Sequence, residues 1–364
     1  MLNFIRNLSK RYKKPEIKEN TFILWEPCSV SHSEVLPGYA KYLLDMGYHV
    51  SVIVNPERYK EGLFSKFKEE NITFNKMNAK NVLKYFKYDS LEDVKGVMVT
   101  TVGKLCKDTN IDEAYTHFHP TVDRKKLLFV EHDIKIAVDE NRLRKDVITL
   151  RKMNYKNAET IAINPHYFGD VAITPKNETI TNFLTIGDIK PRKKDSGLIV
   201  EAVQKLYDKG YENFKVTVIG RGKLKGIPKK LHKFFDIKGR LPFSKMYEEI
   251  EKADFMLTAY DDKNPQHQRY NTRGTSGNFQ LIYGFLKPCI IIESFAPINK
   301  FNSSNSILYK TVDEYAEALE KALNMNSEEY SKMQGSLKEC KDEVYSESLN
   351  NLKGLINERN SCCV

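Results

Sequence analysis

The chain has 364 residues, of which 41% are hydrophobic, and its formal net charge is +10. This length exceeds what one hydrophobic core usually supports, so we expect two domains. The six cysteines form no Cys-x-x-Cys pair, which argues against a zinc site and a disulfide framework and fits a reducing cytosol. No apolar run approaches the ~20 residues of a membrane-spanning helix, and the N-terminus lacks signal-peptide features. We expect a cytoplasmic protein, soluble or peripheral at a membrane.

The basic excess has two explanations. Lys, Asn and Tyr are all abundant, as an AT-rich genome produces without selection for any partner, yet residues 1–14 carry five positive charges and no negative one. Their apolar residues share one helical face, a pattern suited to an anionic membrane interface. The alternative is a basic tail that packs on the protein or stays disordered. The residues concerned are Leu2, Ile5, Leu8 and Tyr12 on the apolar face, and Arg6, Lys10, Arg11, Lys13 and Lys14.

In the first half of the chain, short apolar runs alternate with segments of helical period, which predicts a parallel sheet covered by helices. A strand over Thr21 to Glu26 is followed by a helix, and a strand over Val50 to Val54 closes the first β-α-β unit. That helix presents Val35, Tyr39, Leu43 and Met46 on one face. The further strands expected here are Val97 to Thr101, Leu127 to Glu131 and Thr160 to Asn164.

After a segment without period from Asp170 to Thr181, expected to be the linker, the same alternation restarts. The chain is predicted to be helical from Ser327 onward. We therefore expect an α/β protein with an N-terminal domain over 1–178, a second domain over 179–345 and a C-terminal helix or tail over 346–364. The expected elements of the second half are strands Asn182 to Ile186, Phe214 to Ile219, Asp254 to Ala259 and Cys289 to Glu293, and helices around Ile199 to Leu206, Lys245 to Lys252 and Asn278 to Phe285.

Three turns that follow strands of the second domain carry glycines or cations. They are Gly187 to Lys194, Gly220 to Lys223 and Arg273 to Asn278. Each has a purely structural explanation: a tight turn, a solvated basic loop, or a helix N-cap made by Thr275 or Ser276. Because they follow strands of one sheet, however, they should converge at one edge, where backbone N–H groups and cations together suit a diphosphate.

The segment from Phe183 to Pro297 resembles the donor-binding domain of GT-B glycosyltransferases, particularly the retaining group of family four and its bacterial polysaccharide-assembly relatives. Four pieces match in the expected order: "FLTIGDIKPRKKDSGLIVEAV", "VTVIGRGKL", "FDIKGRLPFSKMYEEIEKADFMLTAY" and "RGTSGNFQLIYGFLKPCIII". The resemblance implies two Rossmann-like parallel-sheet domains facing a cleft. It also implies transfer of a hexose-type sugar from a nucleotide-sugar donor to a glycan or lipid-linked acceptor, with no other cofactor.

Some positions depart from the family's pattern. The family's two glutamates, eight positions apart, fall on Arg273 and Leu281, and its arginine after the first glycine is Asp188, although Lys193 stands at the paired lysine. The pattern indicates a divergent branch that binds an anionic donor without those carboxylates. The expected donor and phosphate contacts are Gly187, Arg192, Lys193, Gly220, Arg221, Arg273, Gly274, Thr275, Ser276, Gly277 and Asn278.

The N-terminal half matches the family in outline only. "PCSVSHSEVLPGYAKYLLDMGYHVSVIV" is similar to the first β-α-β unit of the acceptor domain, and "LLFVEHDIK" resembles the strand after which such enzymes often place a histidine near the sugar. His132 and Glu131 are therefore the candidate catalytic residues. Glu34 and Asp133 are further candidates for a general base, and a structural role for a histidine after a strand is the alternative.

A departing diphosphate can be stabilised by a metal or by fixed cations and helix-end N–H groups. We expect the second route and no metal. The only adjacent acidic pair after a predicted strand is Asp261 and Asp262, and two neighbouring carboxylates in a polar loop are usually solvated. A sugar-nucleotide epimerase of the same fold and a non-catalytic nucleotide-sugar-binding protein are the alternatives. We expect no nucleic-acid partner, because the aromatic residues do not interleave with the cations as a stacking platform would.

Overall fold

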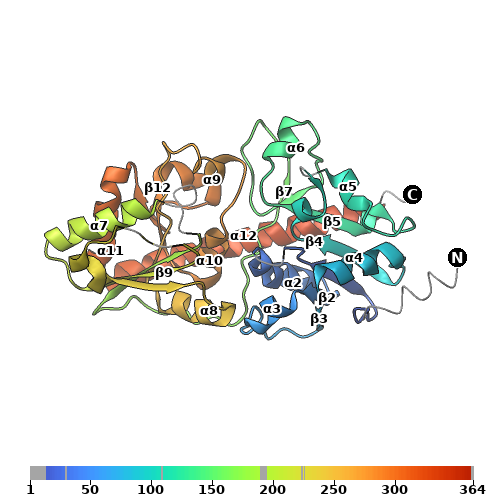
Figure 1. Ribbon diagram of the computed structural model, residues 1–364, viewed down its shortest axis with the longest axis horizontal. Coiled ribbons are helices and arrows are strands. Elements are labelled where there is room, and N and C mark those ends of the chain that lie inside the picture. The colour runs from blue at the N-terminus through green and yellow to red at the C-terminus, as the bar shows by residue number, and fades with distance from the viewer. Residues whose placement is uncertain are drawn as a thin grey trace. The chain divides into compact units, whose positions relative to one another are not determined.

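The computed structural model describes residues 14–28, 31–107, 110–188, 195–222, 224 and 226–361. The chain divides into two compact units (Figure 1). One contains the residues up to Asp170 together with those from Ser346 onward, and the other runs from Val171 to Tyr345. The division thus falls a few residues before the expected boundary at 178, and the segment 346–364 joins the first unit instead of standing apart.

In the part of the first unit that the structure describes, seven parallel strands form one sheet in the order β3-β2-β1-β4-β5-β6-β7. Every residue of the central β1 and β5 is buried, as expected for strands covered on both faces. The strands are β1 (Thr21–Trp25), β2 (His49–Val54), β3 (Ile72–Lys76), β4 (Val94–Val99), β5 (Leu127–Glu131), β6 (Ile148–Thr149) and β7 (Ile161–Ala162).

Helix α2 (Leu36–Asp45) packs on β1 and β2 and begins with a proline in its first turn, where no N–H is needed. Val35, Tyr39 and Leu43 are buried, as their spacing predicts. Helix α4 (Ala79–Tyr88) is capped by the side chain of Asn78. The other short helices of this unit are α3 (Pro56–Lys60), α5 (Ile111–Tyr115), α6 (Lys135–Asp139) and the 3-10 turns Ser33–Val35, Val102–Lys104 and Arg124–Lys126.

The described strands of the second unit form a six-stranded parallel sheet in the order β10-β9-β8-β11-β12-β13. Its core lies along β8, β11 and β12, whose side chains are almost all buried. The strands are β8 (Thr181–Ile186), β9 (Phe214–Ile219), β10 (Phe235–Gly239), β11 (Phe255–Leu257), β12 (Cys289–Ile292) and β13 (Ile307–Tyr309).

The helices of the second unit include α7 (Ser196–Asp208), capped by the side chain of Asp195, and α10 (Gly277–Phe285), which is buried from Asn278 to its end. The last helix, α12 (Ser327–Ser361), begins in the second unit and ends in the first. The others are α8 (Phe243–Lys252), α9 (Arg269–Thr272), α11 (Tyr315–Asn324) and the 3-10 turns Lys229–Phe234, Glu293–Phe295, Pro297–Asn299 and Val312–Glu314.

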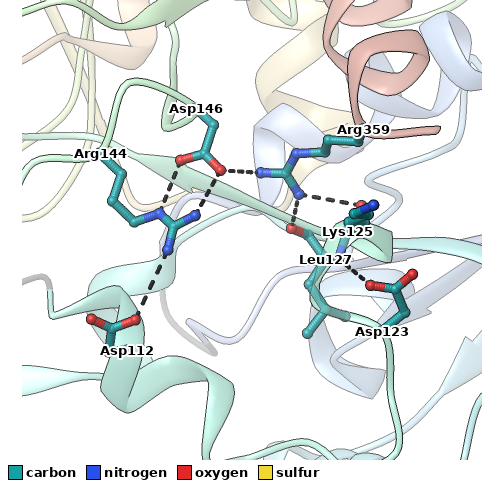
Figure 2. Close-up of polar contacts among 7 residues, drawn as sticks. All are labelled: Asp112, Asp123, Lys125, Leu127, Arg144, Asp146 and Arg359. Carbon is teal, nitrogen blue, oxygen red and sulfur yellow. Dashed lines mark hydrogen bonds and ion pairs between the residues drawn. The ribbon is translucent and has the colours of Figure 1, made fainter. Parts of the chain in front are cut away.

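The end of α12 is held against the first sheet by Arg359 (Figure 2). Its guanidinium donates hydrogen bonds to the carbonyl oxygen of Leu127, at the start of β5, and to Asp146 at 2.7 Å. Arg144 also bonds Asp146, through two nitrogens at 3.1 Å each. Burial acts to raise the pKa of Asp146, but the hydrogen bonds from Arg144 and the charge of Arg359 outweigh it and hold that pKa below its ordinary value.

Each sheet reverses its strand order at one point, between β1 and β4 in the first unit and between β8 and β11 in the second. In open parallel sheets, ligands bind outside the carboxyl ends of the strands at such a reversal. No helix in the described part of the chain is long and apolar enough to cross a membrane.

Some expected features lie outside the described residues: the amphipathic pattern over 1–13, the basic turn from Ile189 to Lys194, and Lys223. Lys14, the last basic residue of the N-terminal segment, is described. Its ammonium group lies 2.7 Å from the carboxylate of Asp89, an exposed ion pair of little energetic weight.

Candidate functional site

Two glycine turns lie side by side at the carboxyl ends of β8 and β9. Gly187 and Gly220 have φ angles of 124° and 149°, which favour glycine. A Cβ atom on Gly220 would lie 1.7 Å from the carbonyl oxygen of Gly187, so no other residue fits there. A Cβ atom on Gly187 would meet no described atom within 4 Å. Among the described residues, therefore, nothing covers the first turn on the side where a Cβ atom would lie, which suits a phosphate-binding turn.

The start of α10 lies at the same edge, because this helix leads back from the carboxyl end of β11 to β12. Ser276 occupies the N-cap position with an extended backbone, but its side chain makes no capping hydrogen bond. The N-cap explanation for this turn is therefore wrong for Ser276. The first N–H groups of a helix have no partner within it, so an uncapped start offers donors to an anion.

Two polar groups at the start of α10 are buried without a hydrogen-bond partner among the described residues. They are the hydroxyl of Thr275 and the amide nitrogen of Asn278, whose side chain is 5% exposed. Gln280, one turn along the helix, is 1% exposed, and neither of its amide atoms is bonded within the described chain. An unpaired buried polar group costs about 1–3 kcal/mol, so native proteins seldom keep several together without a function.

The expected cations are placed as follows. Arg221, next to the second glycine turn, is exposed, and Arg273 is partly buried before α10. Arg192 and Lys193 lie outside the described residues. Gly274 is buried, and Gly277 opens the helix. The structure thus brings Gly187, Gly220, Arg221 and the segment from Arg273 to Asn278 to the carboxyl edge of one sheet.

Both residues of the acidic pair after β11 have hydrogen-bond partners within the second unit. Asp261 accepts a hydrogen bond from the N–H of Lys263 at 2.9 Å, and Asp262 accepts one from the hydroxyl of Ser294 at 3.0 Å. Among the residues that the structure describes, no group of three or more His, Cys, Asp or Glu side chains is placed to hold a metal ion.

A second polar cluster lies at the strand reversal of the first sheet, where β1, β4 and β5 end. Glu26 follows β1 and is 4% exposed. One of its carboxylate oxygens accepts hydrogen bonds from the hydroxyls of Thr100 and Thr101, both at 2.7 Å, and the other accepts the N–H of Cys28 at 2.6 Å. Burial raises the pKa of Glu26 to about 7, although these hydrogen bonds oppose the shift.

His132 follows β5 and joins this cluster. Its Nε2 atom lies 2.7 Å from the carbonyl oxygen of Thr100 and 3.2 Å from the hydroxyl of Thr101. Burial and the charge of His32, whose ring centroid lies 4.4 Å away, lower the pKa of His132 to about 3. The imidazole is therefore neutral near pH 7, and the residue as a whole is partly exposed.

Glu131 supports the turn in which His132 lies. Its Oε1 atom accepts hydrogen bonds from the N–H groups of His132 at 2.7 Å and Asp133 at 3.3 Å. The carboxylate packs over Gly103, where a Cβ atom would come within 3.2 Å of it. Glu34 is partly exposed, and burial of its carboxyl raises its pKa. Of the four candidates, His132 has the chemistry of a ligand contact, and Glu131 orients the turn.

Glu26, Thr100 and Thr101 were not predicted as site residues from the sequence. Their signal is a polar residue directly after an apolar strand: Glu26 follows Trp25, and the two threonines follow Val99. The expected strand ended at Thr101, which placed both threonines inside β4 rather than at its carboxyl end.

No protein-family model and no curated protein sequence matches this chain. Solved structures do match its fold. One is AviGT4, described as a glycosyltransferase involved in avilamycin A biosynthesis, with 11% identity, a TM-score of 0.55 and coverage of 93% of this chain and 98% of that one. Another is described as "Trehalose-6-phosphate from E. coli bound with UDP-2-fluoro glucose", with 10% identity, a TM-score of 0.52 and coverage of 92% and 99%. The chain has the GT-B fold, with two parallel sheets covered by helices.

Proposed function

We propose that the chain is a glycosyltransferase that moves a sugar from a nucleotide-diphosphate donor to a glycan or lipid-linked acceptor without a metal. One observation carries the proposal: the start of α10 lies at the same sheet edge as the glycine turn at Gly187, and there the buried polar groups of Thr275 and Asn278 have no partner among the described residues. The fold supports it, because one structure of this fold is described as bound with a nucleotide sugar and another as a glycosyltransferase.

The donor's diphosphate is the group that this edge suits. Breaking a sugar–phosphate bond leaves negative charge on the departing diphosphate, and preorganised donors lower the free energy of that state. Backbone N–H groups of α10 and of the glycine turns supply such donors, and Arg221 and Arg273 supply positive charge. In the proposal Arg192 and Lys193 add to this charge from the turn after Gly187.

His132 is the proposed contact to the transferred sugar or the acceptor. Its imidazole is neutral at physiological pH, so it can accept a hydrogen bond from a hydroxyl group. Glu131 is the second catalytic candidate and acts by holding the His132 turn through its two backbone hydrogen bonds.

The donor site is tested by Thr275→Val and Asn278→Leu, which remove the unpaired polar groups at similar size. We expect nucleoside diphosphates, assayed by calorimetry with UDP, GDP and ADP, to bind about tenfold more weakly, which corresponds to about 1.4 kcal/mol. Thermal stability of Thr275→Val without ligand should stay unchanged or rise, because the removed hydroxyl has no partner among the described residues.

The matched control replaces Lys229 and Lys230, exposed cations on a 3-10 helix of the same unit, with alanine. If the control weakens binding as much as Thr275→Val, the attraction is diffuse and the proposed site is wrong. Sugar donors of the nucleotide that binds are then incubated with and without acceptor, and the products are analysed. A transferase needs the acceptor to form its product, whereas an epimerase does not. Loss of transfer in EDTA, restored by Mg²⁺ or Mn²⁺, would contradict metal independence.

In the proposal, residues 1–14 attach the enzyme to the membrane that carries a lipid-linked acceptor. Their basic and apolar residues suit reversible attachment to an anionic membrane, at about 1 kcal/mol for each basic residue near the surface. The full chain should therefore bind vesicles that contain phosphatidylserine more tightly than a chain that starts at Pro15. Equal binding by the two chains would remove the membrane from the proposal.

A further inference from the structure

A chain of hydrogen bonds joins Glu26 to His132 across three strands of the first sheet. Glu26 follows β1, Thr101 follows β4 and His132 follows β5. The hydroxyl of Thr101 lies 2.7 Å from Glu26 Oε2 and 3.2 Å from His132 Nε2. Within the first unit, therefore, a buried carboxylate reaches the imidazole through a single hydroxyl group.

The acceptor atoms fix the direction of each bond in this chain. The carbonyl oxygen of Thr100, 2.7 Å from His132 Nε2, can only accept, so Nε2 carries the proton. The hydroxyl of Thr101 donates its hydrogen to the ionised Glu26, so toward His132 it can only accept as well. Both contacts favour the same tautomer. In that tautomer Nδ1 carries the lone pair, and no described residue donates a hydrogen bond to it.

We propose that Glu26 is a positioning residue that acts through the hydroxyl of Thr101 to keep His132 in its Nε2–H tautomer, so that Nδ1 accepts a hydrogen bond from a substrate hydroxyl. The inference deepens the proposed function and rests on it for the identity of that substrate. The second hydrogen bond to the same carboxylate oxygen, from Thr100, and the N–H of Cys28 on the other oxygen hold Glu26 in place.

An amide at position 26 cannot reproduce these contacts. If the Gln oxygen faced the threonines, its NH₂ group would face the N–H of Cys28, and two donors would meet. The nitrogen of Cys28 lies 2.6 Å from the Glu26 oxygen that accepts its hydrogen bond. With the NH₂ group toward the threonines, it would donate to Thr101, whose own hydrogen would then point toward His132 Nε2. That hydrogen would oppose the Nε2–H tautomer.

Other titratable groups also face this chain. Glu34 and His32, from the segment before α2, act on His132 by charge, and Glu34 also acts on Glu26. Tyr39, on α2, is coupled to Glu26, and burial raises its pKa far above the physiological range. The test must therefore isolate the route through Thr101 from a general change in electric field.

The experiment is a double-mutant cycle read by nitrogen NMR of the full-length protein labelled with ¹⁵N-histidine, without ligand. His132→Asn assigns the signals. We expect wild type to show His132 almost entirely as the Nε2–H tautomer at pH 8. Glu26→Gln should raise the Nδ1–H population at least threefold when Thr101 is present and should change it little in the Thr101→Val background. Thr101→Ser, which keeps the hydroxyl, should behave like wild type.

An unchanged His132 spectrum in Glu26→Gln would overturn the inference. An equal change in both Thr101 backgrounds would overturn it too, because Glu26 would then act through the field or the fold. Should Glu26→Gln fail to fold, wild type and Thr101→Val are titrated instead. In wild type, ionisation of Glu26, whose pKa is about 7, should produce a step in the His132 nitrogen shifts near pH 7. Thr101→Val should at least halve this step, and an undiminished step would overturn the inference.

The readout needs neither donor nor acceptor, so its failure is distinguishable from failure of the proposed function. If calorimetry supports the donor site while the tautomer does not depend on Glu26, only this inference falls. In a transfer assay, Glu26→Gln should lower kcat about tenfold and change KM for the donor little, because the residues proposed to bind the donor's diphosphate lie in the other unit. A change confined to KM would contradict a positioning role.

Discussion

Glu26 is an acidic side chain with almost no exposed surface, and its carboxylate is bonded by two hydroxyls and one N–H group. These three donors do not replace the hydration that the charge loses on burial, because the pKa of Glu26 still rises to about 7. At neutral pH the protein therefore pays for a charge in its interior. Such an arrangement is common where a fold keeps an ionisable group for a task other than stability.

The pH dependence of stability should show this cost. Because the folded pKa of Glu26, about 7, lies above its ordinary value of 4.5, the carboxyl stabilises the fold below pH 4.5, and this contribution is lost as the pH rises through 7. The shift corresponds to at most about 3 kcal/mol. From pH 4.5 to pH 8.5, the free energy of unfolding of Glu26→Gln should rise relative to wild type by up to that amount, measured by urea denaturation.

His132 affects the free energy of unfolding with the opposite pH dependence, and the difference between wild type and Glu26→Gln removes this effect. The pKa of His132 is lowered to about 3, so its contribution is present above pH 6.5 and is lost as the pH falls toward 3. Both proteins contain His132, so its contribution largely cancels in the difference. A difference in unfolding free energy that stays constant with pH would show that Glu26 keeps its ordinary pKa.

At the scale of elements, the guanidinium group of Arg359 bonds the end of α12 to the first sheet (Figure 2). The Arg359 side chain is 12% exposed and bonds both a carboxylate and the first carbonyl of β5, which links the helix to the sheet. Arg144, on the other side of Asp146, is 42% exposed. Charge-assisted hydrogen bonds away from water are the stronger kind, so the two arginines should differ in weight.

Arg359→Met should lower the free energy of unfolding by about 1.5–3 kcal/mol, because the Leu127 carbonyl and Asp146 each lose a charged donor. Arg144→Met, the matched control, should cost about 1 kcal/mol or less, because its pair is more exposed. Urea denaturation measures both. Equal losses would mean that Asp146, rather than the docking of α12, carries the energy.

The sequence predicted the buried elements better than the edges of the sheets. Strands β5 and β9 were predicted with the bounds that the structure has. Strand β5 is an apolar run that ends at Glu131, and β9 alternates buried and more exposed residues before Gly220. Strands β3, β6 and β13 were not predicted, and β10 was expected only within the segment "FDIKGRLPFSKMYEEIEKADFMLTAY" that resembles the family. Strands β3 and β10 lie at a sheet edge and are mostly half-buried or exposed, so their polar residues hide the β pattern. Strands β6 and β13 have only two and three residues, too few for a pattern.

The same limit applies to the sites. The glycine turns could be found from sequence, because each follows its strand directly. The bonds from Thr100 and Thr101 to Glu26 could not, since they join residues about 75 positions apart through the pairing of β1 with β4. The missing partners of Thr275 and Asn278 are likewise a property of packing, which a single sequence does not reveal.

For the whole molecule, the first unit depends on residues from the far end of the chain. Leu352 is fully buried, Leu355 is 4% exposed, and the hydroxyl of Ser348 accepts the backbone N–H of Asn164 at 2.9 Å. A chain that ends at Tyr345 loses all of these contacts. Deleting one buried leucine side chain alone costs about 2–5 kcal/mol, and a domain's whole stability is about 5–15 kcal/mol.

We therefore expect a chain that ends at Tyr345 to lose the first unit selectively. Limited proteolysis with mass spectrometry should show early cleavage within residues 14–170, whereas residues 171–345 should stay protected as in the full chain. A peptide of residues 346–361, added in excess, should restore part of the protection. Equal protection of both units in the truncated chain would show that the last segment does not support the first unit.

This arrangement also sets an order for folding during synthesis. The segment from Ser346 is made only after the whole of the second unit, which takes roughly 9–35 s at a typical translation rate of 5–20 residues per second. During that time the first sheet has been made but lacks its contacts with residues 346–361 of α12. The second unit can finish folding while the first is still incomplete, so the nascent chain exposes apolar surface near its N-terminal end to chaperones until the last turns of α12 leave the ribosome.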